Sequence, residues 1–92
     1  MKEVEVQIIN KLGLHVRAAT QLVQLAASFD AEISLTCNGQ TADAKSIMDV
    51  LMLAGTINSI LHIQATGIDS EEEAQVIKKL SDLINNRFNE KE

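Results

Sequence analysis

The chain has 92 residues, with thirteen acidic against eight basic side chains and a formal net charge of -5. Its length predicts a single domain over residues 1–92 with one hydrophobic core, and its acidic balance argues against nucleic acid or an anionic membrane as a partner. With two phenylalanines and no tyrosine, tryptophan or proline, the core should be mostly aliphatic, and a base-stacking platform is implausible. We expect the partner to be a protein.

Cysteine usage and the chain's start bear on its compartment. Cys37 is the only cysteine, so an internal disulfide is impossible, and no group of His and Cys has the spacing of a metal site. We therefore expect no metal and no cofactor. Residues 1–4 lack the charged and then apolar run of a signal peptide, and no apolar stretch reaches the length of a membrane span. We expect a cytoplasmic protein in which Cys37 is a reduced strand residue.

A strand is the first predicted element, because apolar and polar residues alternate from residue 3 to residue 8, the period of a strand with one buried face. This strand ends near Asn10. A helix follows from His15 to about Ser28. Its apolar residues recur three and four positions apart, as on one helix face; they are Ala19, Leu22, Val23 and Ala26.

The next segment predicts a β-hairpin. Residues Ala31 to Cys37 alternate between apolar and polar side chains, as a half-buried strand does. Asn38-Gly39 is the preferred pair for a two-residue type I′ turn. Residues Gln40 to Asp43 should therefore pair back as a short strand.

A short apolar helix is predicted after Ser46, which is a good N-cap residue, and Gly55 is its expected stop. A helix of this length cannot bury all of its apolar side chains. We expect Val50 and Leu53 to face the core. The residues expected to be at least partly exposed are Ile47 and Met48.

The last strand and the last helix follow. Residues Ile60 to Thr66 predict a strand with Leu61, Ile63 and Ala65 facing the core. Residues Ser70 to Glu73 form a capping box with acids at the positive end of a helix, so the final helix should begin there. Its polar tail should fray. Its expected buried stripe consists of Ala74, Ile77, Leu80, Ile84 and Phe88.

The predicted order is therefore strand, helix, strand, strand, helix, strand, helix. Strands with one apolar face and three helices between them favour an antiparallel sheet that is covered on one side. The predicted fold class is α+β, an open-faced β-sandwich. The pattern alone does not determine the strand order.

A histidine stands at the start of the first helix, in Gly13-Leu14-His15-Val16-Arg17. Helix starts leave backbone N–H groups without intrahelical partners and carry partial positive charge, so a phosphoryl group fits there. The same field favours a neutral His15, whose ring nitrogen can attack phosphorus, and Arg17 can supply paired N–H donors to phosphate oxygens. The segment is thus suited to a transient phosphohistidine, although spacing alone favours a surface histidine beside a solvated arginine.

Two segments carry a resemblance to a known family. Residues 13–20, Gly-Leu-His-Val-Arg-Ala-Ala-Thr, resemble the active-site segment of HPr, the histidine phosphocarrier of the bacterial phosphoenolpyruvate-dependent sugar phosphotransferase system. Residues 45–51, Lys-Ser-Ile-Met-Asp-Val-Leu, resemble the family's regulatory-serine motif, at the family's distance from the histidine. The likeness covers nearly the whole chain, including Phe29 and Gly67. It implies the HPr fold, a four-stranded antiparallel sheet with three helices on one face.

The resemblance implies a carrier rather than an enzyme. His15 would accept a phosphoryl group on Nδ1 from enzyme I, itself charged by phosphoenolpyruvate, and would pass it to an enzyme IIA domain. Arg17 matches the family's phosphate-contacting arginine, and the backbone N–H groups of Val16 and Arg17 would help to hold the group. We expect a monomer with transient protein partners. The residues that match the family's partner surface are Ile47, Met48, Leu51 and Met52.

Ser46 matches a serine that an HPr kinase/phosphorylase phosphorylates in some family members, although serine at this position is also simply a good N-cap. Three positions depart from the family pattern: Val16, Ala18 and Asp49 replace the usual alanine, proline and glycine, respectively. The loss of proline removes a preset helical dihedral and should loosen the loop slightly without removing a phosphate ligand. Asp49 lies one turn from Ser46, where its charge would oppose a serine phosphate.

Two other functions stay open. A paralogue in a nitrogen-type or regulatory phosphotransferase chain would use the same chemistry as a signal, and a neighbouring gene for a sugar permease or for a regulatory enzyme IIA would discriminate between the two. A non-catalytic α+β interaction module would keep the fold and carry no phosphate. His15 and Arg17 argue against such a module, whereas Ala18 and Asp49 leave room for it. The sequence does not tell which sugar system is served.

Overall fold

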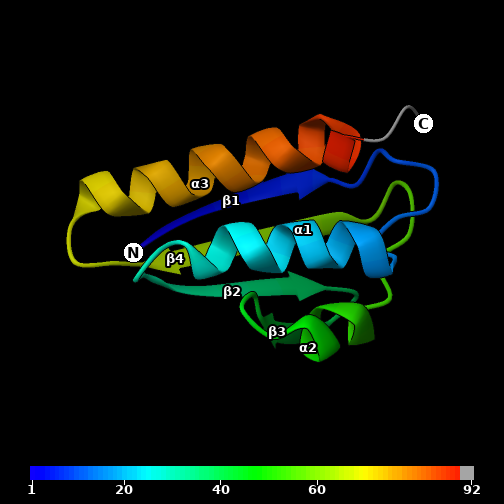
Figure 1. The fold of residues 1–92 in the computed structure, drawn as a ribbon, viewed down its shortest axis with the longest axis horizontal. Coiled ribbons are helices and arrows are strands. Elements are labelled where there is room, and N and C mark those ends of the chain that lie inside the picture. Colours follow the sequence, from blue (N-terminus) through cyan, green and yellow to red (C-terminus); the bar gives the residue numbers. More distant parts are fainter. Residues whose placement is uncertain (90–92) are drawn as a thin grey trace.

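A computed structural model describes residues 1–89, in which strands and helices follow one another in the predicted order (Figure 1). The expected fraying of the tail falls on residues 90–92, outside the described part of the chain. The elements are β1 (Lys2–Gln7), α1 (Val16–Ala27), β2 (Glu32–Cys37), β3 (Gln40–Asp43), α2 (Ile47–Met52), β4 (Ile60–Thr66) and α3 (Ser70–Asn85), followed by a single 3₁₀ turn, Arg87–Asn89.

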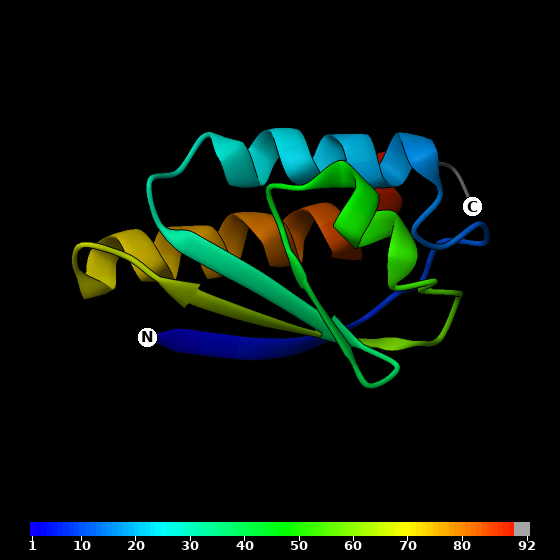
Figure 2. The ribbon, with the colours of Figure 1, turned by 90° about the horizontal axis from the view of Figure 1, so that it is seen from below.

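The four strands form one antiparallel sheet in the order β1-β4-β2-β3. All three helices lie on the same side of this sheet, and the opposite face is left open (Figure 2). The predicted class, an α+β open-faced β-sandwich, is confirmed. Within residues 1–89, no helix is both long and apolar enough to cross a membrane.

The core lies between the sheet and the helices. Leu61, Ile63 and Ala65 of β4 are buried there as predicted, while His62 and Gln64 lie on the open face. Cys37 is also buried, as a strand residue, and desolvation raises the pKa of its thiol. The core is mostly aliphatic, and Phe88 is its largest fully buried side chain.

The hairpin between β2 and β3 has the predicted form. Asn38 and Gly39 have φ angles of 54° and 79°, and a positive φ at both central residues is the requirement of a type I′ turn. β3 runs over the predicted residues, Gln40–Asp43. A local dipeptide thus determines the register of this pair of strands, in which Cys37 lies opposite Gln40.

Helix α2 begins as predicted but ends differently. Ser46 is its N-cap, and the Oγ atom accepts a hydrogen bond from the N–H of Asp49 at 3.4 Å. The left-handed residue that follows the helix is Ala54, with φ of 53°, and not the expected Gly55. Gly55 serves close packing instead, because a Cβ atom there would lie 2.8 Å from side-chain carbons of Ile8 and Leu14.

The cap of α3 was predicted one residue too late. The N-cap is Asp69, whose Oδ1 accepts a hydrogen bond from the N–H of Glu72 at 2.9 Å, while Ser70 is the first helical residue. The Oε1 atom of Glu72 reaches back to the N–H of Ile68 at 3.1 Å. Asp69 and Glu72 therefore take the place of the predicted capping box, with Glu72 bonded to the residue before the N-cap, and a charged carboxylate rather than a hydroxyl satisfies the helix start.

The buried stripe of α3 also differs from the prediction. Ala74 is exposed, whereas Val76 is fully buried. At 3.6 residues per turn, residues 73, 76, 80 and 84 lie within a sector of about 80°, and Ala74 lies about 80° outside it. Phe88 is buried as expected, but in the 3₁₀ turn beyond the helix.

Glu73 is a buried acid that the sequence did not indicate. Its Oε2 atom accepts a hydrogen bond from the N–H of Gly67 at 3.0 Å and lies 3.1 Å from the amino group of Met1. The hydrogen bond from Gly67, together with the nearby ammonium group, lowers the pKa of this carboxyl. Glu73 therefore ties the end of β4 and the start of β1 to α3.

Candidate phosphoryl-acceptor site

The loop between β1 and α1 delivers His15 to its position. At the end of β1, the Ile8 N–H donates to the Ser59 carbonyl at 2.9 Å. The chain then turns, and Gly13 has a φ of +64°. A Cβ atom at Gly13 would lie only 2.3 Å from the Gly55 carbonyl oxygen, so only glycine fits. The Leu14 N–H donates to that same carbonyl at 2.9 Å, which binds the loop to the segment that follows α2.

His15 is the N-cap of α1, as the sequence predicted. Its backbone is extended, with φ of -77° and ψ of 175°, and its half-buried side chain makes no capping hydrogen bond to the amides of this helix. Intrahelical bonding begins with the Ala19 N–H, which donates to the His15 carbonyl at 2.8 Å. The N–H groups of Val16, Arg17 and Ala18 therefore have no acceptor within α1.

Arg17 lies on the first turn of α1 with its side chain exposed. Within residues 1–89, no carboxylate lies within ion-pair distance of its guanidinium group. The first turn of α1 itself contains no acidic residue. The partial positive charge of the helix start and the charge of Arg17 therefore both lie directly after His15, and no acidic residue of α1 neutralises them.

Exposed apolar side chains lie on α2, which packs against α1, and in and just after the loop before α1. Met48 and Met52 of α2 are 65% and 68% exposed, while Ile47 and Leu51 are half-buried against the core. Helices α1 and α2 pack against each other. Two more exposed apolar residues, which sequence reasoning did not assign to this surface, are Leu12 and Val16.

Ser46 lies at the start of α2, the end opposite to the segment that contacts the His15 loop. Its side chain is half-buried and serves as the helix cap. Its backbone N–H donates to the Asp43 carbonyl at 3.0 Å. The residue before Ser46 is held in place as well. The Nζ atom of Lys45 donates a hydrogen bond to the carbonyl of Phe29, just after the end of α1, at 2.6 Å.

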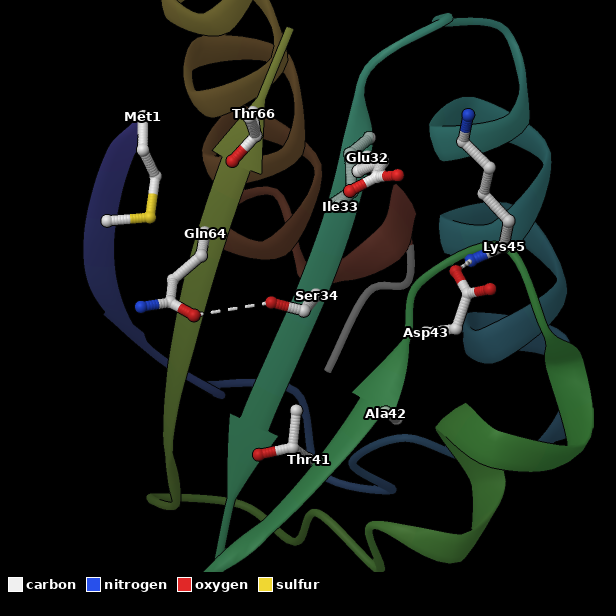
Figure 3. A pocket seen from close by; sticks show the side chains of 10 residues that line it. All are labelled: Met1, Glu32, Ile33, Ser34, Thr41, Ala42, Asp43, Lys45, Gln64 and Thr66. Atoms are coloured by element: carbon white, nitrogen blue, oxygen red, sulfur yellow. Dashed lines mark hydrogen bonds between the residues drawn. The ribbon is translucent and has the colours of Figure 1, made fainter.

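A hollow of about 480 Å³ lies on the open face of the sheet and not at His15 (Figure 3). Polar side chains of three strands line it, including Ser34, Thr41 and Gln64, and Ser34 donates to Gln64 at 3.3 Å. None of the predicted site residues contributes to it. No group of three or more His, Cys, Asp or Glu side chains in the described residues could hold a metal ion.

The fold and the site together define a small open-faced α+β sandwich that presents a histidine at a helix start suited to an anion. The family described as "PTS HPr component phosphorylation site" matches residues 2–86. The chain is 45% identical to the phosphocarrier protein HPr of Cupriavidus necator over 92 residues, which cover 100% of both chains.

Solved structures agree with that match. A crystal structure of HPr-C-His from Thermoanaerobacter tengcongensis superimposes with a TM-score of 0.91 at 38% identity, over 100% of both chains. An HPr dimer from the same organism matches with a TM-score of 0.74 at 39% identity, over 98% of this chain and 100% of that one. The chain belongs to the HPr family, the phosphocarriers of the phosphotransferase system.

Proposed function

We propose that His15 accepts a phosphoryl group from enzyme I, which phosphoenolpyruvate charges, and passes it to an enzyme IIA domain. The observation that carries this proposal is the start of α1, where the histidine precedes three N–H groups that have no acceptor in the helix. The lone pair on Nδ1 forms a bond to phosphorus as the bond between phosphorus and the donor's leaving atom breaks. In the second transfer the N–P bond breaks, and His15 returns to its starting form.

The phosphoryl group is held by the helix start itself. The N–H groups of Val16 and Arg17 point out of the end of α1, where they can donate to phosphoryl oxygens. The exposed guanidinium of Arg17 can add charge-assisted hydrogen bonds. These groups stabilise the phosphoryl group without covalent bonds, so that it remains available for transfer.

The partners dock on the apolar surface of α2 beside the histidine. Met48 and Met52 supply most of its exposed area, with Ile47 and Leu51 behind them. Methionine side chains are flexible and polarisable, which suits a surface that must bind successive partners. A carrier of this kind needs no deep pocket of its own, because the acceptor domain supplies the other half of the site. We propose that it acts in the cytoplasm as a monomer.

The test is incubation with enzyme I and phosphoenolpyruvate, followed by mass spectrometry of the intact protein. The proposal predicts one added phosphoryl group that is labile in acid and stable in base, as a phosphohistidine is, and that is lost to enzyme IIA once enzyme I and phosphoenolpyruvate have been removed. The control variant, His15→Ala, should gain no mass. Equal labelling of the two proteins would contradict the proposal.

Ser46 serves as the cap of α2, and its phosphorylation is a second proposal. A phosphate there would place negative charge beside the partner surface and so weaken docking, although Asp49 would oppose it. The test is incubation with ATP and an HPr kinase/phosphorylase. An acid-stable phosphate that is absent from Ser46→Ala would support this regulation, and no incorporation would exclude it for that kinase.

A further inference from the structure

Asn10 is a polar side chain in an apolar setting, close to the candidate site in the chain. Within residues 1–89, only Asn10 and Glu73 are polar or charged residues that count as buried, and Asn10 is 0% exposed. Burial of an amide group is costly unless hydrogen bonds compensate it. The contacts of Asn10 therefore indicate why a polar residue is placed here.

Asn10 closes the turn that leads to the helix. Its Nδ2 atom donates to the carbonyl oxygen of Gly13 at 2.8 Å. Its own carbonyl accepts a hydrogen bond from the N–H of Gly13 at 3.2 Å. Asn10 thus binds both the carbonyl and the N–H of Gly13, the first through its side chain and the second through its backbone.

The Gly13–Leu14 peptide group is consequently fixed at both of its polar ends. Its carbonyl accepts from Asn10, and its N–H, on Leu14, donates to the Gly55 carbonyl at 2.9 Å. Because a peptide group is planar, two hydrogen bonds at opposite ends determine its orientation. Leu14 then buries its side chain in the core, and the next residue is His15.

We propose that Asn10 is a positioning residue for His15, because its buried amide orients the Gly13–Leu14 peptide and thereby places the imidazole for phosphoryl transfer. The inference deepens the proposed function and rests on it. His15 directly follows Leu14, so the orientation of the Gly13–Leu14 peptide sets the position of the His15 backbone. A displacement of about 1 Å at a reacting group can lower a rate on the order of 10²-fold.

The test compares Asn10→Asp and Asn10→Leu with wild type as acceptors of a phosphoryl group from enzyme I. Asparagine and aspartate have nearly the same shape, but aspartate lacks the NH₂ donor, and leucine keeps a similar volume without polar atoms. We expect kcat to fall roughly 10- to 100-fold and KM to stay within about twofold of wild type, because the α2 surface is unchanged.

The matched control is Val76→Ala, which removes buried volume from α3. It should lower the melting temperature and keep the wild-type kcat. If the Asn10 variants keep the wild-type kcat, or if the control loses as much, Asn10 stabilises the fold only and the inference is wrong.

Two measurements cover the remaining outcomes. If the Asn10 variants do not fold, hydrogen exchange of the Leu14 N–H in wild type decides the question, because exchange as fast as in an exposed loop would overturn the inference and slow exchange would support it. If wild type accepts no phosphoryl group, the proposed function fails separately. The ¹⁵N resonances of the His15 ring then test positioning, which predicts a change in Asn10→Asp and none in Val76→Ala, and an unchanged ring would overturn it.

Discussion

The starts of α1 and α3 are built in opposite ways. At α3, Asp69 caps the helix at 2.9 Å, and Glu71, Glu72 and Glu73 fill the first turn with negative charge. At α1, His15 makes no capping bond to the helix, and the first turn holds no acid. Cap bonds and first-turn acids stabilise a helix. The start of α3 is thus stabilised by its own side chains, whereas the start of α1 keeps amides without an acceptor in the helix, which the proposed function assigns to a phosphoryl group.

The largest expected effect is on the transfer reaction. His15→Ala should remove phosphoryl transfer completely, because no other atom at the start of α1 can form the covalent bond. The variant removes no helix cap, because the wild-type side chain makes no capping bond, so its free energy of unfolding should not fall by as much as when a cap is lost. Transfer assays and urea unfolding of the same sample test both statements. A large loss of stability would mean that the two helix starts are more alike than we infer.

Arg17→Ala should slow the transfer by about 10²-fold, the usual effect of removing one donor to developing negative charge. The fold should be unaffected, because the side chain is exposed and has no carboxylate partner in residues 1–89. Stopped-flow measurement of phosphoryl transfer from enzyme I gives the rate. Arg17→Lys is the control, and its rate should lie between the other two, because lysine keeps the charge and loses the paired geometry. A rate within twofold of wild type for Arg17→Ala would contradict this role.

Exchanging the two kinds of cap sharpens the comparison. Asp69→Ala should lower the free energy of unfolding by about 1 kcal/mol, and His15→Asp should raise it by about 1 kcal/mol, because aspartate can bond the first amides of α1. The second variant should be more stable and inactive. Chemical denaturation measures both changes. If His15→Asp gains no stability, the amides at the start of α1 already have other partners.

Loss of the cap of α2 should have the smallest effect on the free energy of unfolding. Ser46 caps it through a bond of 3.4 Å, longer than that of Asp69. Ser46→Ala should therefore cost about 0.5 kcal/mol, the low end for loss of a cap. Urea denaturation beside Asp69→Ala provides the measurement, and an equal or larger loss for Ser46→Ala would reverse the order that we infer.

Local signals predicted most of the fold and the place of the histidine. The Asn38-Gly39 pair determined the hairpin, and the apolar spacing after His15 located the start of α1. The exit of α2 was wrong because Gly55 is needed against Ile8 and Leu14, a contact between distant segments. A rule for helix ends considers only neighbours in the chain, so it cannot detect that Gly55 must be small to pack against Ile8 and Leu14.

The same reason explains the residues that sequence reasoning missed. Asp69 and Ser70 are both good caps. A capping box that starts at Ser70 needs the side chain of Glu73, but that carboxylate instead bonds the N–H of Gly67 and the amino group of Met1. Asn10 follows a strand in the manner of an ordinary loop residue, and its burial comes with the folded loop, in which its side chain bonds the Gly13 carbonyl. Side chains whose role depends on tertiary contacts leave no periodic pattern.

The most direct test of the account is a comparison of backbone amide resonances before and after phosphorylation of the ¹⁵N-labelled protein by enzyme I. The account predicts a phosphoryl group on Nδ1 of His15 and the largest amide shifts at Val16, Arg17 and Ala18, with no comparable change at the start of α3. Largest shifts elsewhere, or a phosphorylated His15 that leaves these amides unmoved, would contradict the claim that the start of α1 holds the phosphoryl group.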